Sequence, residues 1–306
     1  MAKVSVIIPT HNCIDYLPKS VMSVLNQSHR DLELIIVNDN SCDGSENYLQ
    51  SLHDPRVRVM TTHVASAAKA RNLGLSQARG DYVAFLDADD AWYPLKLSKQ
   101  LALHRRFANA ALSFTNYDHV DESDAMIIDS FAYWGQFLHG EDALIQSDSA
   151  LSLLITTNMI GTSTVMINRK VLKQTLAFDD TIDYGEDWDL WLKIAENHPI
   201  AVLNQCQTRY LMRQDSLTQS DHRRLTNLQS IESIFARYSK SNPTITRRAL
   251  TQGRARILEG YADYYRQSRH FGKALWHGLH ALGLDVQPRR IRSVIGDCRR
   301  ALKLAR

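Results

Sequence analysis

The stretch that decides the fold is Gly80-Asp81-Tyr82-Val83-Ala84-Phe85-Leu86-Asp87-Ala88-Asp89-Asp90, in which an apolar run leads into three carboxylates. An unbroken run of β-branched and aromatic residues is typical of a parallel strand that is covered on both faces. Asp87 and Asp89 follow at its C-terminal edge, where open α/β sheets bind ligands. Because alternate positions of an extended segment face the same way, these carboxylates can converge on one hard cation, Mg²⁺ or Mn²⁺, shared with substrate phosphates.

A solvated acidic turn is the alternative interpretation of these aspartates. In that case Asp90 caps the helix that we expect to begin near Tyr93-Pro94. We favour the cap for Asp90 alone. We favour metal binding for Asp87 and Asp89, because both directly follow a buried strand.

Three strand and helix pairs precede this strand. Their alternation predicts an α/β fold with a doubly wound, mostly parallel sheet flanked by helices. The expected strands are 4–9, 32–37 and 56–60, and the expected helices are 16–27, a segment through 48–52, and 65–78. Neither GxGxxG nor GxxxxGK[ST] occurs, so the phosphates need another device. We assign that role to a metal on the aspartates, aided by cations from Arg71 and from later residues.

A second acidic cluster follows in the next hundred residues. Before it we expect a strand at 111–114, a polar and aromatic segment at 116–140, a helix at 150–157, a strand at 163–167 and a short helix at 169–174. Glu186 and Asp187 follow Gly185 and are expected in the first turn of a helix, where carboxylates complement the helix dipole. That explanation suits Glu186 or Asp189. It leaves Asp187, beside Trp188, as a candidate general base toward a hydroxyl.

Five short motifs, in order along the first 220 or so residues, resemble family 2 glycosyltransferases with a GT-A fold. Any one of them alone is weak, and the five in sequence are strong. They are Val6-Ile7-Ile8-Pro9-Thr10-His11-Asn12, Val37-Asn38-Asp39-Asn40-Ser41, Ala70-Arg71-Asn72, Leu86-Asp87-Ala88-Asp89-Asp90 and Gly185-Glu186-Asp187-Trp188.

The resemblance implies a donor site built from the first four motifs. Pro9 and Thr10, with Asn12 of the same motif, and Asp39 resemble the nucleoside contacts, Asp39 accepting from a base that is most often uracil. Arg71 matches an arginine that lies near the nucleotide. Asp87 and Asp89 match the DxD motif, in which one carboxylate approaches the ribose and the other holds Mn²⁺ or Mg²⁺ on the diphosphate.

The resemblance also implies where the acceptor reacts. Asp187 matches the catalytic base, and Glu186 and Trp188 would shape the acceptor pocket. The residues that resemble the late loop closing over the diphosphate are Tyr210, Arg213, Ser216 and Thr218.

These roles predict a metal-dependent, non-processive hexosyltransferase that works by direct displacement with inversion. The expected donor is a nucleoside-diphosphate sugar, UDP-sugar favoured. The expected acceptor is a hydroxyl of a glycan or lipid-linked molecule in surface polysaccharide biosynthesis. Two alternatives stay open: a nucleotidyltransferase, which would normally need an early glycine-rich basic loop, and a catalytically silent nucleotide-sugar or glycan-binding protein, which would need no base.

The tail after about residue 220 reads as four helices. They are expected at 225–238, 245–267, 271–282 and 289–304, the second and third resembling one tetratricopeptide-like pair. One such pair cannot form a solenoid. We therefore predict a GT-A domain over 1–219, with a nucleotide-sugar half at 1–100 and an acceptor half at 101–219, and a helical region over 220–306.

Composition is that of a soluble globular protein, and no run approaches the ~20 apolar residues that span a bilayer. The four scattered cysteines suggest neither a zinc site nor a disulfide framework, so a cytoplasmic location is expected. Residues 289–306 carry seven Lys or Arg against Asp297, which suits either a solvated basic end or peripheral contact with the inner face of a membrane. Nucleic acid is not expected, because stacking aromatics are lacking there.

Overall fold

A computed structural model describes residues 3–138, 140–172, 176–213 and 223–304 of the chain. These residues form two compact units. Of the described residues, the sheet unit takes those up to Ala150 together with Met159–Thr181 and Glu186–Arg213. The helical unit takes Leu151–Asn158, Ile182–Gly185 and residues 223–304. The boundary that we predict at 219/220 lies outside the described residues.

The sheet unit is built on one mixed sheet with the strand order β3-β2-β1-β4-β9-β6-β10-β5. Two further strands lie outside this order: β7 pairs with β6, and β8 pairs with β10. β1 runs parallel to β2 and β4, and β6 runs parallel to β10, whereas β9 is antiparallel to both its neighbours. The strands are β1 (Val4–Thr10), β2 (Leu32–Asp39), β3 (Val57–Thr62), β4 (Tyr82–Phe85), β5 (Ala91–Trp92), β6 (Leu112–Val120), β7 (Met126–Asp129), β8 (Ala143–Ile145), β9 (Met166–Asn168) and β10 (Ile200–Leu211).

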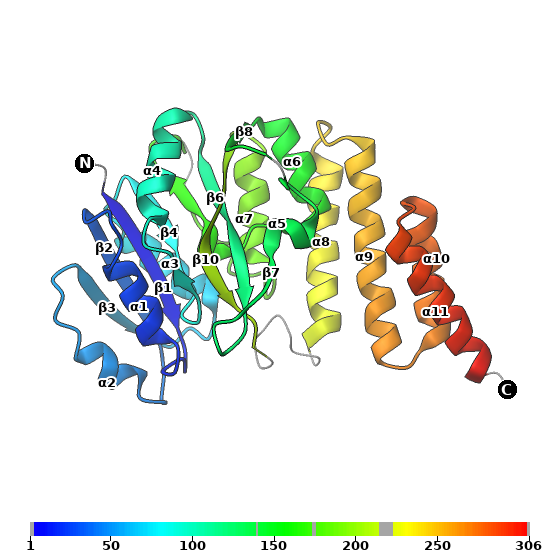
Figure 1. The fold of residues 1–306 in the computed structure, drawn as a ribbon, viewed down its shortest axis with the longest axis horizontal. Coiled ribbons are helices and arrows are strands. Elements are labelled where there is room, and N and C mark those ends of the chain that lie inside the picture. The colour runs from blue at the N-terminus through cyan, green and yellow to red at the C-terminus, as the bar shows by residue number, and fades with distance from the viewer. Residues whose placement is uncertain (1–2, 139, 173–175, 214–222, 305–306) are drawn as a thin grey trace. The chain divides into compact units, whose positions relative to one another are not determined.

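Both faces of β1 are covered, as its largely apolar sequence requires. Val6 and Ile8 point to one face and join a core with α1 (Leu17–Leu25), which lies in front of the sheet in Figure 1. Ile7 points to the other face, where α3 (Ala67–Gln77) packs so closely that a Cβ on Gly74 would lie 2.6 Å from Ile7 Cγ2. The expected α/β sheet with flanking helices is confirmed.

Five further helices precede the tail among the described residues, and the tail is helical as expected. Before the tail come α2 (Ser45–Gln50), α4 (Lys96–Arg106), α5 (Ser130–Trp134), α6 (Ser147–Thr156) and α7 (Glu186–Ala195). The tail holds α8 (Arg224–Ser241), α9 (Arg247–Gln267), α10 (Phe271–Leu284) and α11 (Pro288–Leu304), each packed on the next in the yellow-to-red part of Figure 1. Among the described helices, none has the length and apolar character needed to cross a bilayer.

Three expectations for the middle of the chain were wrong or incomplete. β10 was not foreseen, because polar residues interrupt its apolar start. The strand expected at 163–167 begins only at Met166, since Thr162–Thr164 form a 3₁₀ turn. The short helix expected at 169–174 is a turn over 169–171, and residues 173–174 lie outside the described part.

Gly80 lies just before β4, where the chain passes close to the backbone at the start of β1. A Cβ there would lie 2.6 Å from the Ser5 nitrogen and 2.8 Å from the Lys3 carbonyl oxygen, neither of which can turn aside as a side chain would. Gly80→Ala is therefore expected to lower the free energy of unfolding by about 3 kcal/mol, measured by denaturant unfolding. The control is Gly140→Ala, where the nearest atom to a new Cβ is 3.7 Å away. Equal stability of the two variants would contradict the close packing.

Candidate active site

The loops that follow β1 and β2 are joined at the C-terminal edge of the sheet. The Asn12 backbone nitrogen donates to Ser41 Oγ at 3.0 Å, and Asn12 Oδ1 accepts from the Cys42 nitrogen at 2.8 Å. Asn12 and Asn40 have φ of 50° and 55°, a left-handed conformation that asparagine tolerates better than most residues. Asn12, which we assigned to the donor site, therefore fixes the shape of this edge.

Asp39 ends β2 with both carboxylate oxygens bound to the loop before α3. Oδ1 accepts from the Val64 nitrogen at 2.8 Å and Oδ2 from the Ser66 nitrogen at 3.2 Å. Thr10, at the end of β1, is buried, and its hydroxyl has no hydrogen-bond partner among the described residues. Pro9 precedes it in β1 at a partly exposed position. These side chains line an edge at which a buried hydroxyl is left to bind a ligand.

Arg71 connects the two acidic motifs. Its side chain is buried on α3, with Nη2 donating to Asp87 Oδ1 at 2.7 Å and Nη1 donating to Glu186 Oε1 at 2.8 Å. Burial alone would lower the pKa of Arg71, but Asp87 and Glu186 raise it, so the guanidinium stays charged. One planar guanidinium thus holds the two acidic motifs together, although Glu186 lies 115 positions from Arg71 in the sequence.

Asp89 is paired with the last described residue of the sheet unit. Arg213 Nε donates to Asp89 Oδ2 at 2.9 Å, and its guanidinium lies 5.4 Å from the centre of the Tyr16 ring. Burial and then Asp87 raise the pKa of Asp89 despite this pairing. Carboxylates thus outnumber guanidinium groups at this edge. Tyr210, the other described member of the late loop, lies on β10, and Ser216 and Thr218 lie outside the described residues.

Asp90 does not cap a helix, so that prediction was wrong. The next helix, α4, begins at Lys96, because the short strand β5 intervenes. Asp90 is buried instead and accepts hydrogen bonds from Ser163 Oγ at 2.6 Å and from the Leu211 nitrogen at 3.0 Å. Burial, followed by the charges of Asp89 and Asp87, raises its pKa well above the usual value. Asp90 therefore holds the DxD turn against β10.

Asp187 lies in the first turn of α7, as predicted. Its Oδ2 accepts a hydrogen bond from Thr162 Oγ1 at 2.9 Å, and its Oδ1 accepts from the Trp188 nitrogen at 2.6 Å. Burial and then the adjacent Glu186 raise the pKa of Asp187 to about 6, whereas Arg71 and the Thr162 hydroxyl act to lower it. A carboxylate with this pKa is largely ionised at neutral pH and still basic enough to accept a proton.

The other two residues of this motif are less accessible. Trp188 is only 3% exposed, so its ring offers little surface to a ligand. Glu186 is held by Arg71. Reasoning from the sequence missed Thr162 and Ser163, although a run of three hydroxyl residues at 162–164, just before a strand, was a signal that could have found them. Ser163 Oγ also accepts from the Asp87 nitrogen at 3.0 Å, so this turn contacts both acidic motifs.

Thr162→Val is expected to move the acidic limb of the pH profile of kcat/KM upward by about one pH unit. Loss of the hydroxyl removes a donor that favours the charged carboxylate, which raises the pKa of Asp187 above its value of about 6. A base is active when deprotonated, so a higher pKa makes activity decline at a higher pH. Thr181→Val, which removes a hydroxyl bonded to Asp179 at 2.6 Å, is the matched control and should leave the limb in place. An unmoved limb in Thr162→Val would exclude Asp187 as the group that sets it.

A small cleft of about 180 Å³ opens beside Asp89 in the sheet unit. It is lined by Tyr16 and Lys19 at the start of α1, by Arg209 and Leu211 of β10, and by the turn between β6 and β7. It combines acidic and basic side chains and is open to solvent, which suits a polar ligand next to the DxD motif.

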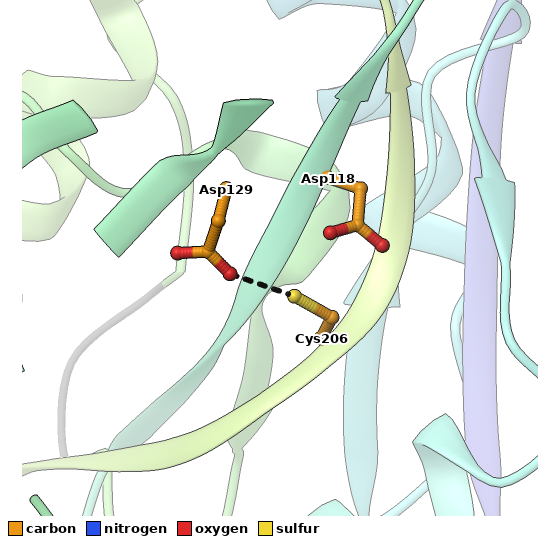
Figure 2. A group of neighbouring side chains, drawn as sticks. All are labelled: Asp118, Asp129 and Cys206. Carbon is orange, nitrogen blue, oxygen red and sulfur yellow. Dashed lines mark hydrogen bonds between the residues drawn. The ribbon is translucent and has the colours of Figure 1, made fainter. Parts of the chain in front are cut away.

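A second group of possible metal ligands lies apart from the predicted residues. Asp118 on β6, Asp129 on β7 and Cys206 on β10 have ligand atoms within 4.8 Å of one another (Figure 2). The Tyr93 hydroxyl donates to Asp118 at 2.8 Å, and the Cys206 thiol donates to Asp129 at 3.2 Å. Burial and then these carboxylates raise the pKa of Cys206, which keeps it a thiol. The cluster is therefore a satisfied hydrogen-bond network across three strands.

The comparisons with known proteins agree on one family. The model of glycosyl transferase family 2 matches residues 5–176, more than half of the chain. The chain therefore belongs to glycosyl transferase family 2 and is a glycosyltransferase, which confirms the resemblance.

Two named relatives are matched by this chain over most of their own length. The putative teichuronic acid biosynthesis glycosyltransferase TuaG of Bacillus subtilis is 36% identical over 219 residues, covering 70% of this chain and 81% of TuaG. The UDP-Glc:alpha-D-GlcNAc-diphosphoundecaprenol beta-1,3-glucosyltransferase WfgD of Escherichia coli is 29% identical over 226 residues, covering 72% of this chain and 82% of WfgD. An uncharacterised glycosyltransferase of Rickettsia bellii is 33% identical over 71% of this chain, but the chain spans only 30% of its length.

Among solved structures, TarS residues 1–349 of S. aureus in complex with UDP-GlcNAc superpose with a TM-score of 0.60 at 17% identity. The match covers 98% of this chain and 92% of that chain. It shows that the GT-A type of fold is shared.

Proposed function

We propose that this glycosyltransferase moves a sugar from a nucleoside-diphosphate donor, a UDP-sugar, to a hydroxyl of a glycan or lipid-linked acceptor, with a divalent metal and with inversion. The observation that carries this proposal is the Arg71 fork, which holds Asp87 of the donor motif and Glu186, the neighbour of Asp187, on one guanidinium. Donor binding and proton abstraction need groups in such proximity. The raised pKa of Asp187, about 6, is also in the range that suits a general base.

The donor site comprises Pro9, Thr10, Asn12 and Asp39 on the nucleoside side. Three observations support a nucleotide there: a buried Thr10 hydroxyl without a partner among the described residues, the linked loops, and the position at the C-terminal edge of parallel strands. WfgD is named for UDP-Glc, and TarS was solved with UDP-GlcNAc, so uracil is the favoured base. Arg213 and the cation of Arg71 would lie toward the diphosphate.

The residues present fit a divalent metal at Asp87 and Asp89. Both are hard oxygen donors, and the raised pKa of Asp89 reflects burial and crowding by a like charge that a cation would relieve. Two carboxylates are also what Mn²⁺ or Mg²⁺ uses when substrate phosphates supply further ligands. When bound, the metal would neutralise charge on the diphosphate leaving group.

The chain's own residues account for the remaining steps. Asp187 accepts the proton of the acceptor hydroxyl as that oxygen forms a bond to the anomeric carbon. The bond from this carbon to the diphosphate oxygen breaks on the opposite face, and Arg213 stabilises the charge that develops there. Glu186, held by Arg71, keeps the pKa of Asp187 raised, while the Trp188 backbone nitrogen donates to Asp187 Oδ1. An α-linked donor would give a β-linked product, and an α-linked product would refute this geometry.

The acceptor is proposed from relatives and chemistry together. TuaG is named for teichuronic acid biosynthesis and WfgD for a diphosphoundecaprenol-linked acceptor, so surface polysaccharide assembly on a lipid carrier is the favoured setting. Such an acceptor places the enzyme in the cytoplasm at the inner face of a membrane. We also retain the proposed division into a GT-A domain at 1–219 and a helical region at 220–306.

The test is calorimetric titration of nucleoside diphosphates into the full chain, with Mn²⁺ and then with chelator. We expect UDP to bind with Mn²⁺ and to lose most of its affinity when the metal is removed. Binding of UDP-sugars without any transfer to lipid-linked acceptors would favour a silent binding protein. Failure of every nucleotide to bind would overturn the donor site.

A further inference from the structure

Helix α11 is packed with Arg290, Val294 and Asp297 inward. Asp297 is fully buried and accepts two hydrogen bonds from Arg266 on α9, from Nε at 2.7 Å and from Nη2 at 2.9 Å. Arg290, only 4% exposed, is paired with Glu259 of α9 at 3.2 Å. Ion pairs thus fix this helix within the helical unit.

An adjacent face of α11, a little over about 100° around the helix axis from the buried side, is apolar and faces solvent. Ile291, Ile295 and Leu302 are 40%, 48% and 68% exposed. Their spacing of four and seven residues places them within about 40° of one another around the helix axis. Because the charged side already fixes the helix, this stripe is not needed to hold it in place. Large apolar side chains aligned on an outer face mark an interaction surface.

Arginines flank this stripe, and the whole helical unit is basic. Arg292 and Arg299 are exposed, and within the described part of the chain neither has an ion-pair partner. Residues 223–304 contain 17 Lys or Arg and 5 Asp or Glu, a net charge of +12 in a chain whose total is +3. Positive charge is therefore concentrated on the unit that presents the apolar stripe.

We infer that α11 docks on the anionic surface of a lipid bilayer. Ile291, Ile295 and Leu302 enter the boundary between headgroups and acyl chains, while Arg292 and Arg299 bind lipid phosphates. The exposed Val286, in the turn before α11, adds apolar surface at the start of the helix. This combination of an apolar stripe with flanking cations is what an interfacial helix needs.

Charge excludes the other occupants of this face. A second copy would bring two units of +12 together, with unpaired arginines on both sides of the contact. A nucleic acid would match the charge but would leave the aliphatic stripe without a stacking partner. An anionic bilayer satisfies both features at once.

The experiment is co-sedimentation of the full chain with phosphatidylglycerol vesicles and with phosphatidylcholine vesicles. We expect binding to the anionic vesicles that weakens with salt. Ile295→Ser should lower the partition coefficient about tenfold. Arg292→Gln should lower it about fivefold. Arg248→Gln removes the same charge from the exposed start of α9 in the same unit, about 16 Å along that helix from Glu259, and should change it little.

Two results would overturn the inference. One is binding to both vesicle types alike, or binding by Ile295→Ser at the wild-type level. The other is a dimer in sedimentation velocity that Ile295→Ser dissociates, which would assign the face to a second copy. The inferred membrane-binding face does not depend on the proposed reaction. UDP titration of the same variants tests the donor site separately, and the UDP affinity should be unchanged.

Discussion

Asp187→Asn is expected to lower kcat about 100- to 10,000-fold, the range that a positioned general base contributes. The amide keeps the size of the side chain and can still accept from Thr162, but it cannot take a proton. Asp87, Asp89 and the two arginines are untouched, so UDP affinity in the presence of Mn²⁺ should stay close to that of the wild type. Steady-state kinetics and calorimetry on the same preparation separate the two effects.

Asp183→Asn is the matched control for that variant. It removes one exposed carboxylate four residues earlier and should leave both kcat and UDP affinity unchanged. A transfer rate of Asp187→Asn within a few-fold of the wild type would remove Asp187 from the mechanism. Loss of UDP binding in the same variant would instead show that the residue belongs to the donor site.

Asp89→Asn is expected to abolish metal-dependent donor binding. Mutating a residue that only supports a metal ligand costs up to ~100-fold in affinity, so the affinity for UDP with Mn²⁺ should fall by more than that. Chelator should then have little further effect on UDP binding. Asp89 is one of only two carboxylates proposed to hold the ion, and the amide carries no charge to offset it. Calorimetry with UDP, and Mn²⁺ binding followed by electron paramagnetic resonance, both report the loss without any need for turnover.

The control for Asp89→Asn is Asp31→Asn, an exposed carboxylate just before β2, at the opposite edge of the sheet. It changes the net charge equally and should not alter Mn²⁺ or UDP binding. Equal UDP affinity in the wild type and in Asp89→Asn would rule out metal binding at this position. The stability of the variant should be checked as well, because Asp89 also pairs with Arg213.

The sequence was sufficient for the fold up to the end of β4. Buried parallel strands such as β1, β2 and β4 are mostly apolar, and each is followed by polar residues that mark the edge of the sheet. The positions of Thr10, Asp39 and Asp87 at strand ends could be predicted because a strand end has local signals. The same reasoning placed Glu186 and Asp187 in the first turn of α7, since a helix start also has local signals.

The sequence was not sufficient where pairing between distant segments decides the structure. β10 contains Asn204, Gln205 and Gln207 and two irregularities in its pairing with β6, so neither alternation nor a continuous apolar run reveals it. Asp90 was misassigned for a related reason. Its partners, Ser163 and the backbone of Leu211, are 73 and 121 residues away, and a helix cap was the local explanation available.

The Arg71 fork has a consequence for how such an enzyme can change during evolution. The same guanidinium pairs with Asp87, which we assign to the donor, and lowers the pKa of Asp187, which we assign to the acceptor proton. A mutation that alters the surroundings of Asp87 to accept a new sugar nucleotide therefore also alters the strength of the base. Donor preference and catalytic rate are therefore coupled in this site. We expect a mutation that improves one of them to need a compensating mutation near the residue that sets the other.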